Sequence, residues 1–431
     1  MIETGYLRAL ALSLAAWLSL YLIFTWTIDP YGVSPIRLEF SRINALKPKR
    51  TDIDRILKPY EVWRYQPRTI FIGTSRANQS LDPSTLDGTR FAPAYNAAIP
   101  GGASMEMHAA YLKQYLRLDH NLRTVIVELF LPHMVGGATP TWADFIGNTV
   151  SLFASANTLW DSLVTLAYNA VSGRPIHQIE RAGYFYHPNR PDPKTLFERF
   201  PGYIWSSAVH NPDRATFDRA AFDAVLEIIE IARANNLELI FLIGPSHPYP
   251  DYYYDVIGAW SVIEEWLTKL SALATVYSFS QPNDWVDEPI SPHMTYWYDT
   301  FHYSLAMGRG MLRSLAGVPT SGLPDNFMER LTPERVAAHI ERRRAAARRW
   351  AQDNPSLVTQ FEEARRKMAR QRKDAALGLR ERWQQRERPN LAAPCTEPSA
   401  PMRLSALARA PIRAVCGPSG GRRPEYGTRQ R

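Results

Sequence analysis

The sequence predicts an α/β protein with a mostly parallel sheet, preceded by one transmembrane helix and followed by a basic tail. Four runs are apolar and rich in β-forming residues, as buried parallel strands are. They cover residues 68–75, 124–130, 237–244 and 275–280. Helical patterns fall between or after these runs, at 104–116, 220–235, 259–273 and 303–315. Strands that alternate with helices imply a mostly parallel sheet.

The predicted transmembrane helix is the uncharged run ALALSLAAWLSLYLIFTWTI, which has 20 residues and covers 9–28. At about 1.5 Å per residue, such a helix crosses the roughly 30 Å hydrocarbon core of a bilayer. Trp26, Tyr31 and Tyr6 stand where interfacial aromatic residues are expected. A cleaved signal peptide is the alternative, but the following WTIDPYGV offers no small-x-small cleavage site. We therefore expect residues 1–32 to be a membrane anchor.

The charges beside this helix favour a cytoplasmic body. Basic residues lie just beyond the helix, at Arg37, Arg42, Lys47, Lys49 and Arg50. The positive-inside rule would keep these residues in the cytoplasm, although large domains can translocate despite such charges. The orientation therefore has to be argued from the chemistry of the body.

The tail differs from the body in charge. The formal net charge of the 431 residues is +8, but residues 331–431 hold 23 Lys and Arg against 10 Asp and Glu, a net of +13. Residues 321–390 are expected to form a solvated basic helix, and 391–431 to be disordered. A charge run is usually solvated surface; the alternative is binding to nucleic acid, acidic lipid or an anionic glycan, and we do not expect nucleic acid to be the partner.

Both cysteines, Cys395 and Cys416, belong to that tail. The body can therefore contain neither a disulfide nor a cysteine-ligated metal. The histidines form no H-x-x-x-H or H-E-x-x-H pair, and no Walker-type phosphate loop is present. We expect neither a metal nor another cofactor.

Residues 134–219 interrupt the alternation of strands and helices and form a predicted insertion. The insertion is rich in aromatic residues, which include Trp142, Trp160, Tyr184, Tyr186 and Trp205. It is either a cap that offers flat apolar surfaces to a ligand or a subdomain that packs its own small core. Asp161 interrupts its most apolar part and argues against a second membrane span.

Three residues could form a nucleophilic relay. Ser75 directly follows the first strand, within the segment Gly-Thr-Ser-Arg at 73–76. Ligands of parallel sheets bind outside the carboxyl ends of the strands, where this serine is expected. Asp299 and His302 form Asp-Thr-Phe-His just before the last helix of the body. This spacing lets the carboxylate face the imidazole Nδ1 while Nε2 points at the serine.

Structural roles for the same residues remain open at this point. Ser75 could be the N-cap of a helix, and Asp299 with His302 could be a capping and surface pair. Gly-x-Ser also occurs at Ser104, Ser246 and Ser419, so the motif alone has little specificity.

Two further residues stand at predicted strand ends. Arg76 could bind a substrate carboxylate or phosphate, or form an ion pair. His247 could line the site or be a structural loop histidine.

With these motifs the sequence resembles the SGNH/GDSL hydrolase superfamily, specifically its membrane-anchored, envelope-associated members with GTSR or GSSR at the nucleophile. Ser75 matches the family's first block, and Asp299 with His302 matches the terminal Asp-x-x-His. Asn96-Ala-Ala-Ile-Pro-Gly101-Gly102 resembles the second block, whose glycine helps to form the oxyanion hole.

The resemblance implies a flavodoxin-like three-layer sandwich over residues 33–320. The chain departs from the family in the third block: the loop after strand 124–130 reads Leu131-Pro132-His133, with no Gly-x-Asn-Asp. An oxyanion hole would then depend on the backbone N–H groups of Ser75 and of Gly101 or Gly102.

The function implied by the resemblance is that of a serine esterase or O-acyltransferase that acts on a cell-envelope polysaccharide or peptidoglycan. The alternative is a non-catalytic envelope protein that binds polysaccharide or a polytopic membrane acyltransferase. Either function implies a single-pass inner-membrane protein with its body on the periplasmic side.

Overall fold

The computed structural model describes residues 2–386 except 35, 37, 101–103, 135–151, 172–177, 181, 187–189 and 207–214. Gly101, Gly102 and Trp142 lie outside the described residues, as do the side chain of Trp205 and the tail 391–431. Residues Met1–Lys373 form one compact unit.

The core of this unit is a six-stranded sheet with the order β2-β1-β3-β6-β7-β8. The strands are β1 (Thr69–Ile72), β2 (Ala94–Asn96), β3 (Thr124–Leu129), β6 (Glu238–Ile243), β7 (Thr275–Ser278) and β8 (Glu329–Leu331). The first five strands in this order are parallel to their neighbours, and β8 is antiparallel to β7. The predicted α/β class is confirmed, and the sheet is mixed because of β8.

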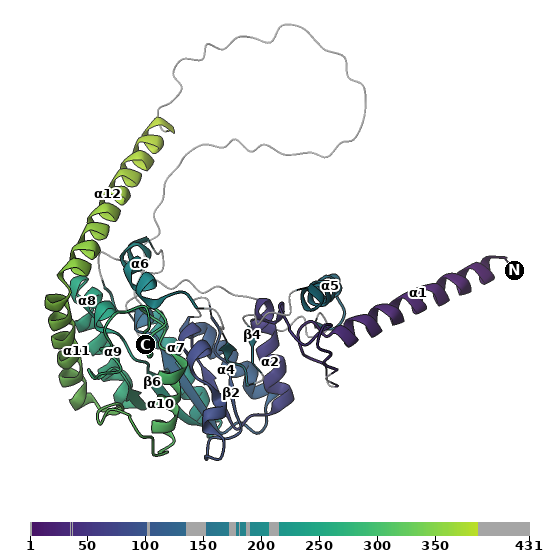
Figure 1. Cartoon of the computed structure of the whole chain (residues 1–431), viewed down its shortest axis with the longest axis horizontal. Helices are drawn as coiled ribbons and strands as arrows, with labels where there is room; N and C mark the ends of the chain where they lie inside the picture. The colour runs from purple at the N-terminus through teal and green to yellow at the C-terminus, as the bar shows by residue number, and fades with distance from the viewer. Residues whose placement is uncertain are drawn as a thin grey trace, which may run out of the picture. The chain divides into compact units, whose positions relative to one another are not determined.

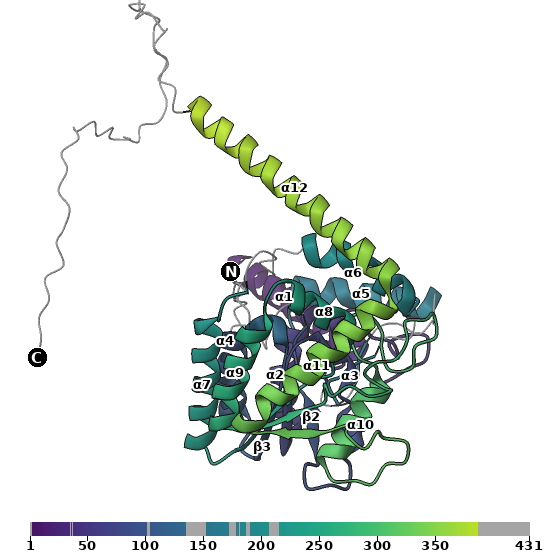
Figure 2. The ribbon, with the colours of Figure 1, turned by 90° about the vertical axis from the view of Figure 1, so that its left-hand side faces the viewer.

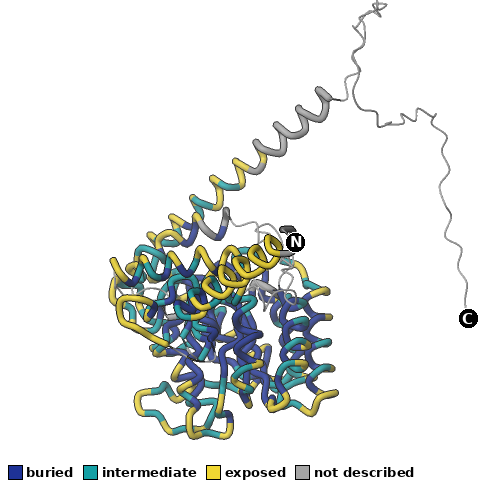
Figure 3. Tube along the Cα trace, turned by 90° about the vertical axis from the view of Figure 1, so that its right-hand side faces the viewer, coloured by how far each residue is buried: buried dark blue, intermediate teal, exposed yellow. Residues whose placement is uncertain are grey.

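Helices cover both faces of the sheet, as Figure 2 shows. On one face α2 (Asp54–Tyr65), α4 (Met105–Leu118), α7 (Arg219–Ala234) and α9 (Trp260–Leu273) lie side by side. On the other face α3 (Ser75–Ser80) packs against α10 (Leu305–Leu315). Every residue of β1 and β3 is buried, and the interior of the unit is dark blue in Figure 3. Buried apolar strands of this kind are typical of parallel sheets covered on both faces.

The insertion carries the helices α5 (Ala156–Val171) and α6 (Pro193–Ser206) and the hairpin strands β4 (Gln178–Ile179) and β5 (Phe185–Tyr186). Helix α6 buries Phe197 and Phe200 in the main core, where Phe200 packs on Phe301 with ring centroids 5.3 Å apart. The hairpin docks beside β2, because Asn96 donates a backbone hydrogen bond to Ala182. These parts of the insertion share the core of the body.

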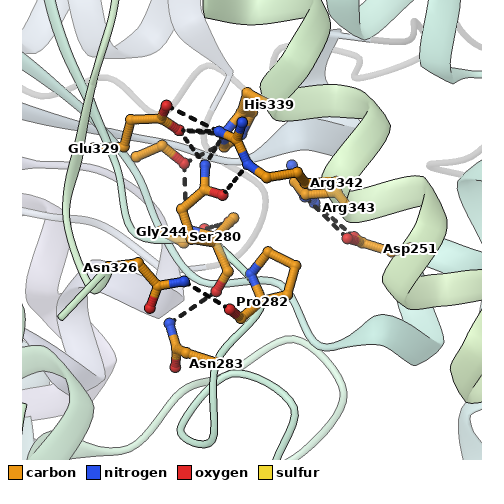
Figure 4. Close-up of polar contacts among 12 residues, drawn as sticks. Gly244, Asp251, Ser280, Pro282, Asn283, Asn326, Glu329, His339, Arg342 and Arg343 are labelled. Atoms are coloured by element: carbon orange, nitrogen blue, oxygen red, sulfur yellow. Dashed lines mark hydrogen bonds and ion pairs between the residues drawn. The ribbon is translucent and has the colours of Figure 1, made fainter. Parts of the chain in front are cut away.

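The chain beyond residue 320 differs from the expected solvated basic helix. Helix α11 (Pro333–Asp353) packs against α8 (Pro248–Val256) and α9, and β8 extends the sheet. Arg343 of α11 is buried and forms two hydrogen bonds to the carboxylate of Asp251, at 2.9 and 2.6 Å (Figure 4). His339 and Arg342, both in α11, form hydrogen bonds with Glu329, the first residue of β8. Although α11 is rich in basic residues, one of its faces is therefore buried and completes the core. Helix α12 (Pro355–Arg386) follows.

We expect Arg343→Met to lower the free energy of unfolding by about 3–5 kcal/mol, because it leaves the buried carboxylate of Asp251 without its cation. Chemical unfolding of the detergent-solubilised full chain would measure this loss. Arg344→Met is the matched control, because Arg344 is partly exposed and its contact with Asp255 is 3.4 Å long. A pair of this kind contributes about 0–1 kcal/mol. Equal losses in the two variants would contradict the buried-pair argument.

Helix α1 (Ile2–Ile28) joins the unit at its C-terminal end (Figure 1). Among the described residues it is the one helix long and apolar enough to cross a membrane or to serve as a signal sequence. Its last carbonyls are bound by the following segment: Lys47 donates to the carbonyl of Ile28 at 2.9 Å, and Asn44 donates to that of Thr27 at 2.8 Å. A cation at a helix C-terminus also favours the helix dipole. The junction between α1 and the segment that follows it is therefore folded, and Lys47 and Asn44 hold that segment against the end of the helix.

Candidate active site

Ser75 is the first residue of α3, immediately beyond the carboxyl end of β1. Thr74, not Ser75, is the N-cap, and its hydroxyl accepts a hydrogen bond from the backbone N–H of Arg76 at 3.4 Å. The Ser75 side chain is thus free of the capping role. The turn also needs glycine at position 73, because a Cβ there would lie 2.8 Å from the Cβ of Ala77 and 3.1 Å from that of Glu128.

Asp299 and His302 lie in the loop between β7 and α10. Asp299 Oδ1 accepts hydrogen bonds from the backbone N–H groups of Phe301 and His302, at 2.8 and 2.9 Å. Short polar side chains often hold turns in this way. The turn places the carboxylate beside the imidazole of the residue three positions later.

The three side chains form a continuous relay. Ser75 Oγ lies 2.8 Å from His302 Nε2, and His302 Nδ1 lies 2.8 Å from Asp299 Oδ2. Because an ionised carboxylate only accepts hydrogen bonds, Nδ1 carries the proton in the neutral imidazole. Nε2 is then left with a lone pair that faces the serine hydroxyl. This is the arrangement in which a histidine can remove a proton from serine.

The electrostatics of Asp299 suit this role. Burial raises the pKa of its carboxyl group, but the charge of His302 and hydrogen bonds from Phe301 and His302 outweigh burial and lower the pKa below its usual value. The carboxylate is therefore ionised throughout the neutral range.

The side chains of His302 and Asp299 keep 22% and 27% of their surface exposed, so molecules from solution can reach the relay.

Ser75 and His302 are held together by contacts between residues 80–82, at the end of α3 and just beyond it, and residues 303–309, just before α10 and in its first turns. Ser80 donates from Oγ to the carbonyl of Tyr303, directly after His302. Asp82 forms an ion pair with Arg309 at 2.9 Å. At Gly308 the backbones meet so closely that a Cβ would lie 1.8 Å from the carbonyl oxygen of Ser80. The distance between Ser75 and His302 is thus fixed by packing outside the relay.

Comparison with known proteins adds little to this geometry. No protein-family model and no curated protein matches the chain. A solved structure from Streptococcus pneumonia, provisionally described as a platelet activating factor, is similar at 14% sequence identity with a TM-score of 0.32. The match covers 61% of this chain and 92% of that one. A likeness of this size carries no inference about function, which has to rest on the site itself.

Arg76 does not face the relay. Its guanidinium is buried, lies 3.3 Å from the carboxylate of Glu128 and donates to the carbonyl of Pro245. The ion-pair alternative from the sequence is therefore the observed one. The partner, Glu128, is fully buried on β3 beneath the turn that carries Ser75. Burial raises the pKa of Glu128 to about 7, although Arg76 and His302 lower it.

Nothing in the sequence singled out Glu128, because a lone glutamate in an apolar strand carries no motif. The structure places its carboxylate next to Arg76, close enough to the relay for the charge of His302 to offset part of the rise that burial causes in its pKa.

Asn96 is also structural in this arrangement. Its side-chain Nδ2 donates to the carbonyls of Ala77 and Leu81, at 2.8 and 2.7 Å, and Oδ1 accepts from the N–H of Ala98. Asn96, which the resemblance placed among the oxyanion- or substrate-binding residues, instead ties the loop after β2 to α3. The buried amine of Lys58 makes a second tie, from Asn78 of α3 to the carbonyl of Ala98. Burial lowers the pKa of Lys58 to about 7.

His247 is the N-cap of α8 and has no contact with the relay. Its Nδ1 accepts from the N–H of Tyr249 at 3.1 Å, and Nε2 lies 3.0 Å from the carbonyl of Glu288. Burial lowers the pKa of this imidazole to about 4. The loop-histidine alternative is the observed one.

Arg190 is a cation beside the site that sequence reasoning missed. It comes from the insertion, its guanidinium carbon lies 3.2 Å from the centre of the Tyr298 ring, and Nη1 donates to Gln79 of α3 at 3.2 Å. Burial lowers the pKa of Arg190, while Tyr298 and Asp299 raise it. A lone arginine in a proline-containing segment matches no motif, so the sequence did not point to it.

Within the described part of the chain, no group of three acidic, histidine or cysteine side chains could hold a metal.

Proposed function

We propose that the protein is a serine esterase or O-acyltransferase that works through an acyl-serine intermediate. The observation that carries the proposal is the relay of Ser75, His302 and Asp299, with both of its contacts at 2.8 Å. Its partial exposure and its position at the carboxyl edge of a mostly parallel sheet support the same conclusion.

In the proposed reaction, Ser75 Oγ attacks the carbonyl carbon of an ester while His302 Nε2 takes the hydroxyl proton. The tetrahedral intermediate then expels an alcohol, which receives that proton, and leaves the acyl group on Ser75. A water molecule or a sugar hydroxyl gives its proton to His302 and attacks the acyl-serine; Ser75 Oγ then leaves, takes the proton back from His302, and releases the acid or the new ester. Asp299 orients the imidazole and stabilises its cation. The backbone N–H of Ser75, with that of Gly101 or Gly102, is proposed to bind the oxyanion.

The proposed substrate is a polysaccharide or peptidoglycan of the cell envelope. The sequence resemblance to SGNH/GDSL hydrolases supports acyl chemistry, and the sheet order is compatible with their flavodoxin-like sandwich. We further propose that α1 anchors the chain in the inner membrane with its body on the periplasmic side, where such glycans lie. A polytopic membrane acyltransferase would be a suitable donor of acyl groups.

Labelling by a fluorescent serine-reactive phosphonate, together with hydrolysis of p-nitrophenyl acetate, tests the proposal on the detergent-solubilised full chain. We expect wild type to be labelled and to turn over, and Ser75→Ala to lose both properties. Ser84→Ala is the matched control, because Ser84 is exposed and its hydroxyl bonds to Asp82 outside the relay. Absence of Ser75-dependent labelling and turnover would favour the non-catalytic alternative, a protein that binds polysaccharide or a membrane acyltransferase.

A further inference from the structure

Helix α5 has its polar and apolar faces reversed relative to a helix on the surface of a soluble domain. Its four buried residues are all polar: Thr158, Ser162, Thr165 and Asn169. Large apolar side chains point outward instead, with exposed fractions of 38% at Leu159, 65% at Trp160, 46% at Leu163 and 88% at Val171. A helix that meets water has the opposite distribution.

The polar face of α5 is held against the segment that follows α1. Asn169 exchanges two hydrogen bonds with the backbone of Leu46, each 2.9 Å long. Asp161, the one Asp, Glu, Lys, Arg or His of α5, accepts a hydrogen bond from the hydroxyl of Tyr31 at 2.7 Å. These contacts fix which face of the helix points away from the body.

The outward face of α5 continues the apolar surface of α1. The two helices are in contact, and Tyr21 of α1 donates to the carbonyl of Ser155 at 2.8 Å. Trp26 of α1 packs on Phe153 with ring centroids 6.2 Å apart. The segment between them adds exposed apolar side chains, at Ile36, Leu38 and Phe40. Figures 1 and 2 show α5 lying across the C-terminal end of α1 rather than along it.

The length of α5 excludes a second crossing of the membrane. Its 16 residues extend about 24 Å, less than the roughly 30 Å of a hydrocarbon core. An apolar face of this kind beside a membrane-crossing helix suits the boundary between headgroups and acyl chains.

We propose that α5 lies in the membrane interface, with Leu159, Trp160, Leu163 and Val171 immersed in the lipid of the leaflet from which α1 emerges. The occupant of this face is the bilayer itself. The inference rests on the proposed membrane anchoring by α1 and goes beyond it: the body would lie on the membrane in one orientation instead of swinging on a tether.

Depth-dependent fluorescence quenching tests this in the full chain. Cys395→Ser and Cys416→Ser remove the natural thiols, and Leu163→Cys then carries an environment-sensitive NBD dye in phospholipid vesicles. The vesicles contain lipids with a nitroxide either near the headgroup or near the end of the acyl chain. Leu20→Cys in α1 is the lipid-exposed reference. Lys269→Cys in α9 is the water-exposed reference, because Lys269 is exposed and α9 lies far from α1 in Figure 1.

We expect the dye at position 163 to be quenched more strongly by the shallow nitroxide than by the deep one, and to be shielded from iodide. The dye at position 269 should respond to iodide alone. A dye at position 163 that behaves like the one at 269 would overturn the inference while the response at position 20 leaves the anchor intact. Shielding from both iodide and lipid would mean that a second copy or another protein covers α5, which also overturns it. Lack of lipid quenching at position 20 would overturn the anchor and the inference together, while phosphonate labelling of Ser75 would still report on the enzyme.

Discussion

Asp299→Asn is expected to reduce the turnover of p-nitrophenyl acetate about 10⁴-fold while the protein stays folded. The amide can still accept the backbone hydrogen bonds of the turn through Oδ1. Its NH₂ group, however, would donate to His302 Nδ1, so that Nδ1 becomes an acceptor and Nε2 carries the proton. A protonated Nε2 cannot take the proton of Ser75. Steady-state kinetics and thermal unfolding of the solubilised full chain would measure the two effects.

Asp284→Asn is the control for this variant. Asp284 is an exposed residue of the same long loop and has no part in the relay. We expect this change to leave turnover at the wild-type level. An Asp299→Asn variant that kept wild-type turnover would show that the carboxylate does not orient the base, and it would contradict the proposed catalytic role of the relay.

Gly308→Ala is expected to lower both stability and activity, although Gly308 touches no reacting group. The added Cβ would lie 1.8 Å from the backbone oxygen of Ser80, and a backbone atom cannot rotate away as a side chain can. Helix α10 must therefore move from α3, at a cost of about 1–3 kcal/mol. His302 precedes α10 and Ser75 begins α3, so the movement changes the distance between them. A displacement of about 1 Å can cost on the order of 10²-fold in rate.

A second glycine provides the control. Gly202 lies in helix α6, and a Cβ there would meet nothing within 4 Å. Gly202→Ala is expected to stabilise the helix by up to about 1 kcal/mol through helix propensity alone, without loss of turnover. Thermal unfolding and the ester assay would be run on both variants. Similar behaviour of the two alanines would contradict the contact between α3 and α10.

The central strands could be predicted because each is a continuous apolar run. The expected segments contain β1, β3, β6 and β7. The two edge strands were missed for physical reasons: β2 has three residues, and β8 reads Glu-Arg-Leu and offers no apolar pattern. Edge strands are often short and charged, since such residues discourage pairing with other chains.

The C-terminal helix was misjudged because composition does not show pairing. In α11 the buried positions follow helical spacing, but two of them are His339 and Arg343. An arginine in a basic run is normally solvated. Arg343 is buried because it pairs with Asp251, which lies too far away in the sequence for a local pattern to reveal the pair. The boundary at residue 320 followed from that reading of the charge.

Within the site, spacing located the relay but could not give the direction of neighbouring side chains. Ser75 and Arg76 are adjacent in α3, and successive helical residues point about 100° apart. One therefore faces His302 while the other is buried on Glu128. Asn96 and His247 likewise stand at strand ends, where loops also need side chains to bind their backbone. Position at a strand end thus predicts where chemistry can occur, but not which polar residue performs it.

The position of Arg343 makes the stability of the body dependent on a helix that follows every residue of the relay in the sequence. Ser75, Asp299 and His302 all leave the ribosome before the guanidinium that neutralises Asp251. Until α11 joins, the buried carboxylate of Asp251 lacks the guanidinium that forms two hydrogen bonds to it. A chain that stops short of α11 contains every residue of the relay, and we expect its body to be less stable because Asp251 lacks this partner. We therefore expect chains that lack α11 to unfold more readily and to be more accessible to proteases.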